Sequence, residues 1–472
     1  MTDSKHDPTG DPTGDPTGDP THAARPQPSA GPSDSSGQPS GLADARPAQH
    51  DPFAAMREPN YRLYAAAFLC SSMGLQMLST AIGWEVYERT GDPYDLGLLG
   101  LARALPVILL TLPAGTIVDG GDRRKILSAT QIAFAGVALC LALASHAAVP
   151  IWVYFVLLVA SGCVRSFNAP SRGALLPSLL PRERFENAVA WQSGFFQFAA
   201  VAGPLVAGFA IAASGHAWVV YALTAALCTV AGVAAIFLKP RPVVRRAPPP
   251  RLADMFQGAQ HIWREKTILG ALTLDMLAVL FGGATALLPI YAKEILHCGP
   301  VGLGALRAAP YLGAFGMAVW LAAKPKFRHA GRALLLSVAV FGVSIIVFGL
   351  STSFWLSIVA LGVGGAADNI SVVIRHILVQ TRTPDELRGR TTAVNSVFIE
   401  CSNEVGAYES GLVASWFGPV ISAVSGGVGT LAVAAIVAVA FPALRRMRNL
   451  TETREGIIRA ELEEEEPRAA GS

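Results

Sequence analysis

The chain has 472 residues, of which 52% are hydrophobic and 15% are charged, and its net charge is +3. Soluble domains carry about 25% charged residues, so this composition excludes a large soluble enzyme. The small net charge gives no indication of a nucleic-acid partner. Six scattered cysteines form neither a CxxC motif nor a Cys/His metal spacing, so we expect no metal and no cofactor.

The first 55 residues are polar and of low complexity. Three copies of Asp-Pro-Thr-Gly occupy residues 7–18, and such a segment has too few apolar side chains to form a core. We therefore predict a disordered arm over residues 1–55. The apolar run that follows is long enough to cross a membrane, which favours an uncleaved signal-anchor over a removable signal peptide.

Long apolar stretches then follow one another, each near the length of about 20 residues that crosses the hydrocarbon core of a bilayer. They predict an all-α integral membrane protein with twelve transmembrane helices in two six-helix bundles. The expected spans are residues 62–87, 95–118, 126–146, 149–169, 187–213, 217–238, 268–291, 301–323, 332–350, 354–377, 391–416 and 419–441.

These spans divide the chain into two similar parts. We predict an N-terminal bundle over residues 56–238 and a C-terminal bundle over residues 268–442. Between them, residues 239–267 are basic and predict a cytosolic linker with a short surface helix. Residues 443–472 are polar, end in an acidic run, and predict a cytosolic tail.

The distribution of Lys and Arg over the loops predicts the orientation. Loops on one side, with their flanks, hold 22 basic residues, whereas the opposite loops hold only Arg89 and Lys293. Positive residues remain on the cytoplasmic side. Both termini and the linker are therefore expected inside, which in a bacterium means a multi-pass protein of the inner membrane.

An internal sequence repeat supports duplication of one unit. Residues 100–106 read GLARALP and residues 304–310 read GALRAAP, and further matches recur at nearly the same offset. Each copy places an arginine, Arg103 or Arg307, inside an apolar run. A duplicated membrane bundle with charges at matching places is typical of a transporter.

The loop after the second span carries a recognisable pattern of small, acidic and basic residues, made by Gly115, Asp119, Arg123 and Arg124. It resembles the loop signature of the major facilitator superfamily, G-x-x-x-D-[RK]-x-G-[RK]-[RK]. Gly120 and Asp122 depart from that pattern, which puts one interaction of the motif in doubt. By this resemblance the four residues form a cytoplasmic gate, with Gly115 allowing close helix packing.

The fifth span contains a helix-kink motif of Gly194, Gly203, Pro204 and Gly208. Proline removes a backbone donor and bends a helix, while glycine lets a neighbour approach. The motif is similar to the antiporter signature of the superfamily, which implies export. A packing kink without bearing on the direction of transport is the alternative.

Two polar segments in the second half, residues 368–375 and 403–411, stand out with Thr273 and Asp275. They resemble the bacterial branch of the superfamily that contains the enterobactin exporter. The resemblance covers residues 57–442. It does not identify the substrate.

Charged residues within the spans are the candidates for chemistry, because a charge at mid-bilayer costs about 2.5–3.5 kcal/mol. Such a charge either couples protons or substrate to transport, or neutralises a partner and holds helices together. Arg165 lies near the inner end of its span, where the resemblance to the superfamily implies a functional arginine, and snorkelling to the interface explains it nearly as well. The candidates are Arg103, Arg165, Asp275, Arg307, Asp368, Arg375, Glu400 and Glu404.

The function expected from these features is secondary active transport, most simply proton-coupled efflux of a drug-like compound or siderophore by a monomer in the bilayer. Uptake, movement of a lipid-like molecule, and a non-transporting sensor or scaffold are alternatives. An enzyme is disfavoured, because no HExxH, GxSxG or P-loop spacing is present.

Overall fold

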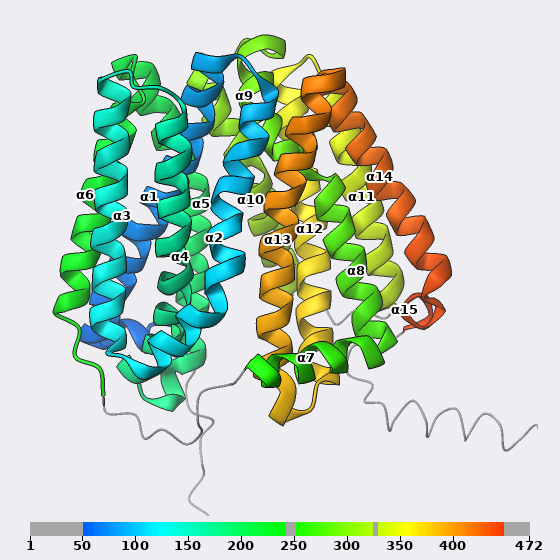
Figure 1. The fold of residues 1–472 in the computed structure, drawn as a ribbon. Coiled ribbons are helices and arrows are strands. Elements are labelled where there is room, and N and C mark those ends of the chain that lie inside the picture. The colour runs from blue at the N-terminus through cyan, green and yellow to red at the C-terminus, as the bar shows by residue number, and fades with distance from the viewer. Residues whose placement is uncertain (1–50, 242–251, 324–328, 448–472) are drawn as a thin grey trace, which may run out of the picture. The chain divides into compact units, whose positions relative to one another are not determined.

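The computed structural model describes residues 51–241, 252–323 and 329–447, except for some side chains within them. In these ranges the ordered elements are helices (Figure 1). The predicted arm lies almost entirely outside the described residues, as do the tail beyond Met447 and the Pro-rich centre of the linker. The description below concerns the unit that starts at Pro52.

The first six long helices make what we call the N half. Short loops join them, and the local sequence explains the turns. The helix α1 ends at Gly91, whose φ of 63° suits glycine, and Asp92 then accepts a hydrogen bond from the Tyr94 amide at 2.9 Å to start α2. The helices are α1 (Pro59–Thr90), α2 (Pro93–Gly120), α3 (Arg123–His146), α4 (Trp152–Leu179), α5 (Phe185–Ser214) and α6 (Trp218–Ile236).

The amphipathic helix α7 (Leu252–Arg264) leads into what we call the C half. It lies across the lower end of that half in Figure 1 and packs on α8 and α13. The elements of the C half are α8 (Lys266–Phe281), η3 (Gly283–Leu287), α9 (Leu288–Ile290), η4 (Tyr291–Ile295), α10 (Gly299–Ala323), α11 (Ala330–Leu350), α12 (Phe354–Arg382), α13 (Asp385–Phe417), α14 (Pro419–Ala440) and α15 (Pro442–Arg446).

The seventh predicted span, residues 268–291, is not one continuous helix. It is interrupted after α8 at Gly282 and Gly283, and three short helical pieces continue it to Ile295. A Cβ at Gly283 would overlap the carbonyl group of Gly406 on α13. The glycine pair that weakens the helix therefore also lets α13 approach it closely.

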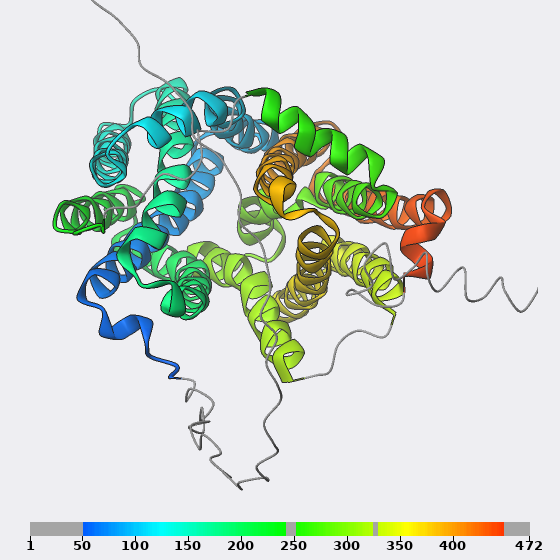
Figure 2. The same cartoon turned by 90° about the horizontal axis from the view of Figure 1, so that it is seen from below.

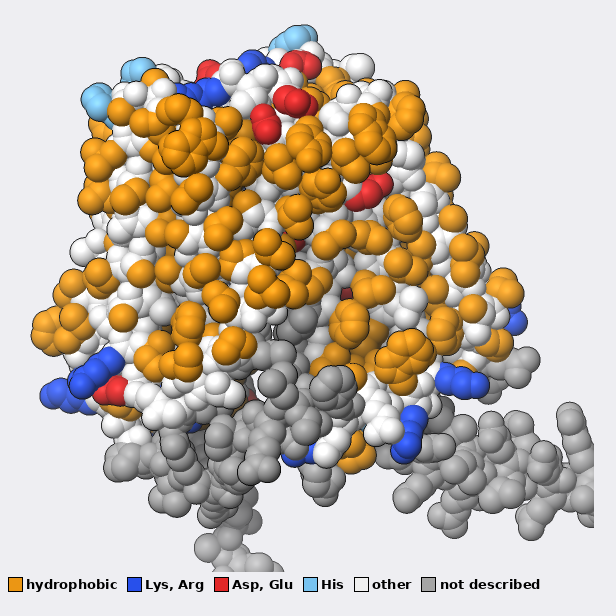
Figure 3. Space-filling view, viewed as in Figure 1, with side chains coloured by type: hydrophobic (Ala, Val, Ile, Leu, Met, Phe, Trp, Pro, Cys, Tyr) orange, Lys and Arg blue, Asp and Glu red, His pale blue; other side chains and the backbone are white. Residues whose placement is uncertain are grey.

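Within the described ranges, eleven helical segments are long and apolar enough to cross a membrane. The remaining predicted span, residues 391–416, lies in α13, which has 33 residues but carries Glu400, Glu404 and Glu409. Hydrophobic side chains cover the middle of the face seen in Figure 3, and charged groups gather toward its two ends. This distribution matches an integral membrane protein of about twelve helices.

The two halves meet along two seams, α2 against α13 and α5 against α10, which can be followed in Figure 2. The other extensive helix contacts stay within one half, such as α3 with α6 and α11 with α14. We call the end that carries Gly91 the outer end and the end that carries α7 the inner end, after the predicted orientation.

Candidate transport site

Close backbone contacts join the halves at the outer end. A Cβ at Gly97 of α2 would lie 2.9 Å from the carbonyl oxygen of Tyr408 on α13, and one at Gly411 would lie 2.6 Å from the Cα of Gly97. On the second seam, a Cβ at Gly208 would overlap the carbonyl of Pro300 on α10. These separations leave no room for side chains, so both seams are tightly closed at this end.

Polar side chains reinforce the closure. The Tyr87 hydroxyl of α1 donates a hydrogen bond to Glu294 of the C half, and the Lys293 ammonium lies 5.6 Å from the centre of the Tyr87 ring. Tyr94 and Tyr408 pack edge to face across the first seam, with ring centres 6.2 Å apart. The outer end is thus sealed by aromatic and charged contacts as well as by glycines.

The inner parts of the same helices are apart. A Cβ added at Gly115 of α2, Gly194 of α5 or Gly316 of α10 would meet no atom within 4 Å. The halves therefore touch from the outer end to mid-depth and separate toward the inner end. Such an arrangement is one of the two states that alternating access requires.

The two arginines of the internal repeat, Arg103 and Arg307, point at one hydroxyl group. Arg103 of α2 and Arg307 of α10 point their Nη1 atoms at the Ser79 Oγ of α1, at 3.4 and 3.0 Å. Neither arginine forms an ion pair within the described part of the chain, and the buried Nε of Arg307 has no hydrogen-bond acceptor there. The Arg307 guanidinium also packs over Gly83, where a Cβ would lie 3.3 Å from Nη2.

One carboxylate stands near this pair. Glu404 of α13 reaches toward α2, since a Cβ at Gly100 would lie 3.2 Å from its Oε2 atom. Gly100 is three residues before Arg103, on the same helix face. Two cations with one neighbouring carboxylate leave an excess of positive charge beneath the outer closure.

Arg165 and Glu400 form an ion pair between the halves. The Arg165 Nη2 atom of α4 donates to both carboxylate oxygens of Glu400 on α13, at 2.9 and 3.0 Å. Their side chains are 44% and 45% exposed, so neither charge is sealed off from solvent. Both residues lie near the middle of their helices, where contact between the halves ends.

The other predicted charges lie within the C half. Asp275 of α8 and Arg375 of α12 form an ion pair, and their side chains are 7% and 6% exposed. The pair joins two helices of the same half, as expected for a charge that holds helices together. Asp368 is half-buried on α12, and no hydrogen bond or ion pair to it is found among the described residues.

The predicted gate residues do not meet the C half in this structure. Arg123 donates to the Ala174 carbonyl at 2.9 Å, and Arg124 donates to the Ile236 and Leu238 carbonyls, both at 3.2 Å. Gly115 faces open space instead of a packed helix. The Asp119 side chain lies outside the described residues. A cytoplasmic gate stays a prediction for the opposite state of the molecule.

The four residues of the helix-kink motif on α5 face different neighbours. Pro204 lies inside α5, and its carbonyl would contact a Cβ at Gly304 of α10. A Cβ at Gly203 would lie 2.7 Å from the Gln76 Cβ of α1, within the N half, whereas Gly208 faces α10. A Cβ at Gly194 would meet no atom within 4 Å. Three of the four residues thus shape contacts of α5, and two of these contacts cross the seam.

Glu85 is a buried carboxylate that the sequence interpretation missed. It is 6% exposed on α1 and accepts hydrogen bonds from Ser145 at 2.7 Å and Tyr154 at 2.8 Å. Arg89, one turn later, lies 3.8 Å from it. The carboxylates chosen from the sequence all lie in the second half, and Glu85 adds one in the first, although the rule that a charge inside an apolar run is significant would have found it.

Comparison with known sequences identifies the family. Residues 50–466 match the sequence profile of the transmembrane secretion effector family. The chain belongs to this family. It is a helical membrane transporter of the major facilitator type, and the family and fold are those of transporters and not of enzymes.

Individual relatives agree with this assignment. The enterobactin exporters EntS of Shigella boydii and of Escherichia fergusonii are each 24% identical over 400 residues, which cover 83% of this chain and 94% of theirs.

Solved structures show the same fold. A bacterial homolog of the human lysosomal transporter Spinster, in an inward-facing and occupied conformation, superposes with a TM-score of 0.65 at 14% identity, covering 82% of this chain and 98% of that one. The nucleoside transporter NupG gives a TM-score of 0.61 at 11% identity, covering 82% and 100%.

Proposed function

We propose that this protein exports a small, negatively charged organic molecule across the bacterial inner membrane in exchange for protons. The observation that carries the proposal is the convergence of Arg103 and Arg307 on Ser79 just inside the outer closure, with no ion pair to either arginine among the described residues. Both arginines are partly buried and, within the described part of the chain, uncompensated by a carboxylate in direct contact, and such cations are unfavourable, so an anion arriving from the inner side would be stabilised there. The printed name of the EntS relatives, enterobactin exporter, supports export as the direction of transport.

Glu400 is proposed as the proton carrier. Its ion pair with Arg165 requires a deprotonated carboxylate, and in the present state the released proton would leave toward the inner side. A proton that had entered from outside on Glu400 would thus be delivered to the cytoplasm before the substrate binds. This order of events is the one that export by proton antiport needs.

The orientation, assembly and domain division belong to the same proposal. Both termini and the linker would lie in the cytoplasm, following the distribution of basic residues. Residues 56–238 and 268–442 would rock against each other around the charged cavity. Because the seams and the charged cluster are complete in one chain, the working unit is proposed to be a monomer.

The test uses everted membrane vesicles, whose cytoplasmic face points outward and whose lumen becomes acidic on respiration. We expect accumulation of enterobactin, or of the anionic dye fluorescein, that stops when a protonophore is added. Accumulation that persists with the protonophore would contradict proton coupling. Accumulation of the cationic dye ethidium alone, or of none of the three probes, would contradict the proposed substrate class.

The arginines are tested in the same vesicles. Arg307→Lys and Arg103→Lys keep the charge but lose the guanidinium fork, so each is expected to raise the half-saturating concentration about tenfold, the effect of about 1.4 kcal/mol. Arg445→Lys, on the exposed surface of the C half, serves as the matched control and should change nothing. If all three variants have the same half-saturating concentration, the two arginines do not bind the substrate.

A further inference from the structure

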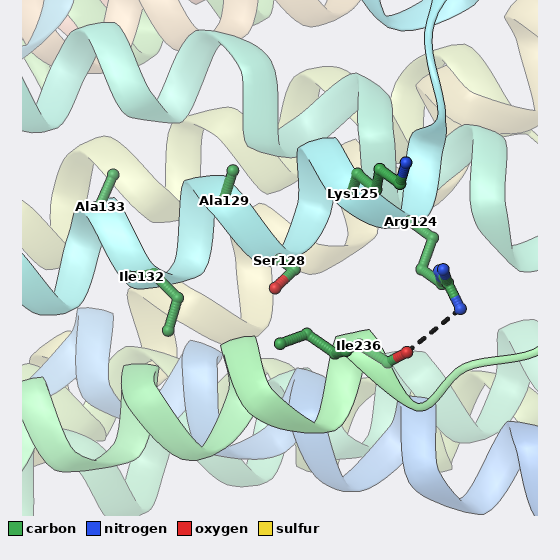
Figure 4. A pocket seen from close by; sticks show the side chains of 7 residues that line it. All are labelled: Arg124, Lys125, Ser128, Ala129, Ile132, Ala133 and Ile236. Atoms are coloured by element: carbon green, nitrogen blue, oxygen red, sulfur yellow. Dashed lines mark hydrogen bonds between the residues drawn. The ribbon is translucent and has the colours of Figure 1, made fainter.

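A pocket lies between α3 and α6 (Figure 4), two helices at the edge of the N half away from the C half (Figure 1). Its volume is about 590 Å³. Arg124, Lys125 and Ser128 line its inner end, and Ala129, Ile132, Ala133 and Ile236 line the rest. Neither the charged cluster at Ser79 nor the seams between the halves contribute a residue to it.

The inner end of the pocket presents two cations in different settings. Arg124 is fixed, because its Nη1 atom donates to the Ile236 and Leu238 carbonyls at the end of α6. Its Nε and Nη2 atoms have no acceptor within the described part of the chain. Lys125 is exposed, and its ammonium has no ion-pair partner there either. The nearby Asp122 carboxylate accepts hydrogen bonds from the Arg124 and Lys125 amides, at 3.1 and 3.3 Å.

The remainder of the pocket is apolar and open toward the bilayer. Ile132 and Ile236 are 42% and 52% exposed, and the same faces of α3 and α6 continue with Leu143 and Val233, which are 61% and 43% exposed. The Ser128 hydroxyl, the one polar group beyond the two cations, donates to the Gly232 carbonyl at 2.8 Å. Among the described residues that line the pocket, none is acidic.

Cations at the membrane surface above an apolar groove between helices match the two parts of a phospholipid with a negatively charged headgroup. We propose that this pocket binds one anionic phospholipid, whose phosphate lies at Arg124 and Lys125 and whose acyl chain lies along Ala129, Ile132 and Ile236. A free anion would contact only the two cations, and an uncharged lipid would contact only the apolar groove, whereas an anionic phospholipid contacts both. The lipid would bridge α3 and α6 at the end of the N half that carries the predicted gate loop.

The site does not depend on the transported substrate or on proton coupling. It requires only that the first turn of α3 lies at the membrane surface, which the apolar span of Arg123–His146 supports. Loss of lipid binding and loss of transport can therefore be observed separately.

The test is a titration of the purified full-length protein in detergent, followed by native mass spectrometry. Phosphatidylglycerol, phosphatidylcholine and inorganic phosphate are compared as probes. We expect one saturable site for phosphatidylglycerol, with much weaker binding of phosphatidylcholine and no competition by phosphate. Equal binding of the two lipids, or displacement of phosphatidylglycerol by millimolar phosphate, would overturn the proposal.

Two variants examine the two parts of the site without disturbing Arg124, which also binds the end of α6. Lys125→Gln removes the exposed cation and should weaken phosphatidylglycerol binding about fivefold. Ala133→Trp fills the groove at an exposed position and should remove the saturable site. Arg445→Gln, an exposed cation outside the pocket, is the control and should bind as the unchanged protein does. Unchanged binding in both pocket variants would place the lipid elsewhere.

A photoactivatable phosphatidylglycerol locates the lipid directly. Cross-linked peptides are expected from residues 123–146 and 218–241, and enterobactin should not reduce their yield. Cross-links confined to the seams between the halves, or competition by enterobactin, would assign the pocket to the substrate path and contradict a lipid site.

Discussion

Ion pairs within the membrane helices of this protein are of two kinds, one buried inside a half and one solvent-accessible between the halves. Asp275 and Arg375 neutralise each other inside the C half, whereas Arg165 and Glu400 neutralise each other across the halves. Only the second pair must change its surroundings when the halves move. The chemistry of coupling is therefore expected at Glu400 and not at Asp275.

Glu400→Gln should separate substrate movement from proton movement. The amide cannot carry the proton, so proton-driven accumulation in vesicles should fall at least about tenfold, while exchange of labelled for unlabelled substrate continues. Glu409→Gln, on the same helix but without an ion pair among the described residues, is the control. Full proton-driven accumulation in Glu400→Gln would remove this residue from the coupling mechanism.

Asp275→Asn should reduce stability without a specific effect on coupling. It leaves the buried Arg375 charge uncompensated, at a cost of about 3–5 kcal/mol, which a lower thermal unfolding midpoint in detergent would report. Replacing both residues, as Asp275→Leu with Arg375→Met, should recover most of that stability and retain transport. A stable double variant without transport would mean that the pair takes part in the mechanism.

Sequence reasoning identified most of these charges but not their pairing. Arg165 and Glu400 are 235 positions apart, and no periodicity relates residues on different helices. The meeting of Arg103 and Arg307 follows from the repeat in the sequence. The two arginines occupy equivalent positions in two pseudo-symmetric halves, and equivalent positions close to the symmetry axis are also close to each other. Ser79 accepts a hydrogen bond from both arginines. It carries no charge, so nothing in the sequence marked it as a site residue.

At the scale of helices, glycine determines where the halves close. The residues Gly97 and Gly411 bring α2 and α13 together at the outer end, while Gly115 and Gly194 have open space around them at the inner parts of α2 and α5. Hydropathy predicted the existence of these helices well, since it depends on length and composition. It did not predict the break after Phe281, because hydropathy counts Gly282 and Gly283 as part of one apolar run and takes no account of the close approach of Gly406 on α13.

Gly97→Val should weaken the outer closure. Its Cβ would come within 2.9 Å of the Tyr408 carbonyl oxygen, so the closed seam would have to open or shift. In a background without the six native cysteines, a cysteine at Ser79 should then react faster with an impermeant maleimide added from outside. Gly136→Val, where a Cβ meets nothing within 4 Å, should leave the rate unchanged. Equal rates in both variants would mean that this glycine contact does not control access.

For the whole molecule, the closed outer seams, the charged cluster beneath them and the separated inner ends form one state of a transport cycle. The predicted gate loop around Arg123 and Arg124 is not engaged with the C half in this state. This is consistent with a gate that closes only when the outer end opens. The motif residues thus have contacts within the N half here and are proposed to exchange them during the cycle.

The central claim is that inward movement of protons drives outward movement of the substrate through this chain alone. The most direct measurement is made in proteoliposomes that contain only the purified protein, an acidic lumen and a pH-sensitive dye inside. Adding enterobactin outside should accelerate alkalinisation of the lumen, and Glu400→Gln should abolish the acceleration. A rate that is the same with and without substrate, while the labelled substrate enters the vesicles, would contradict proton-coupled export.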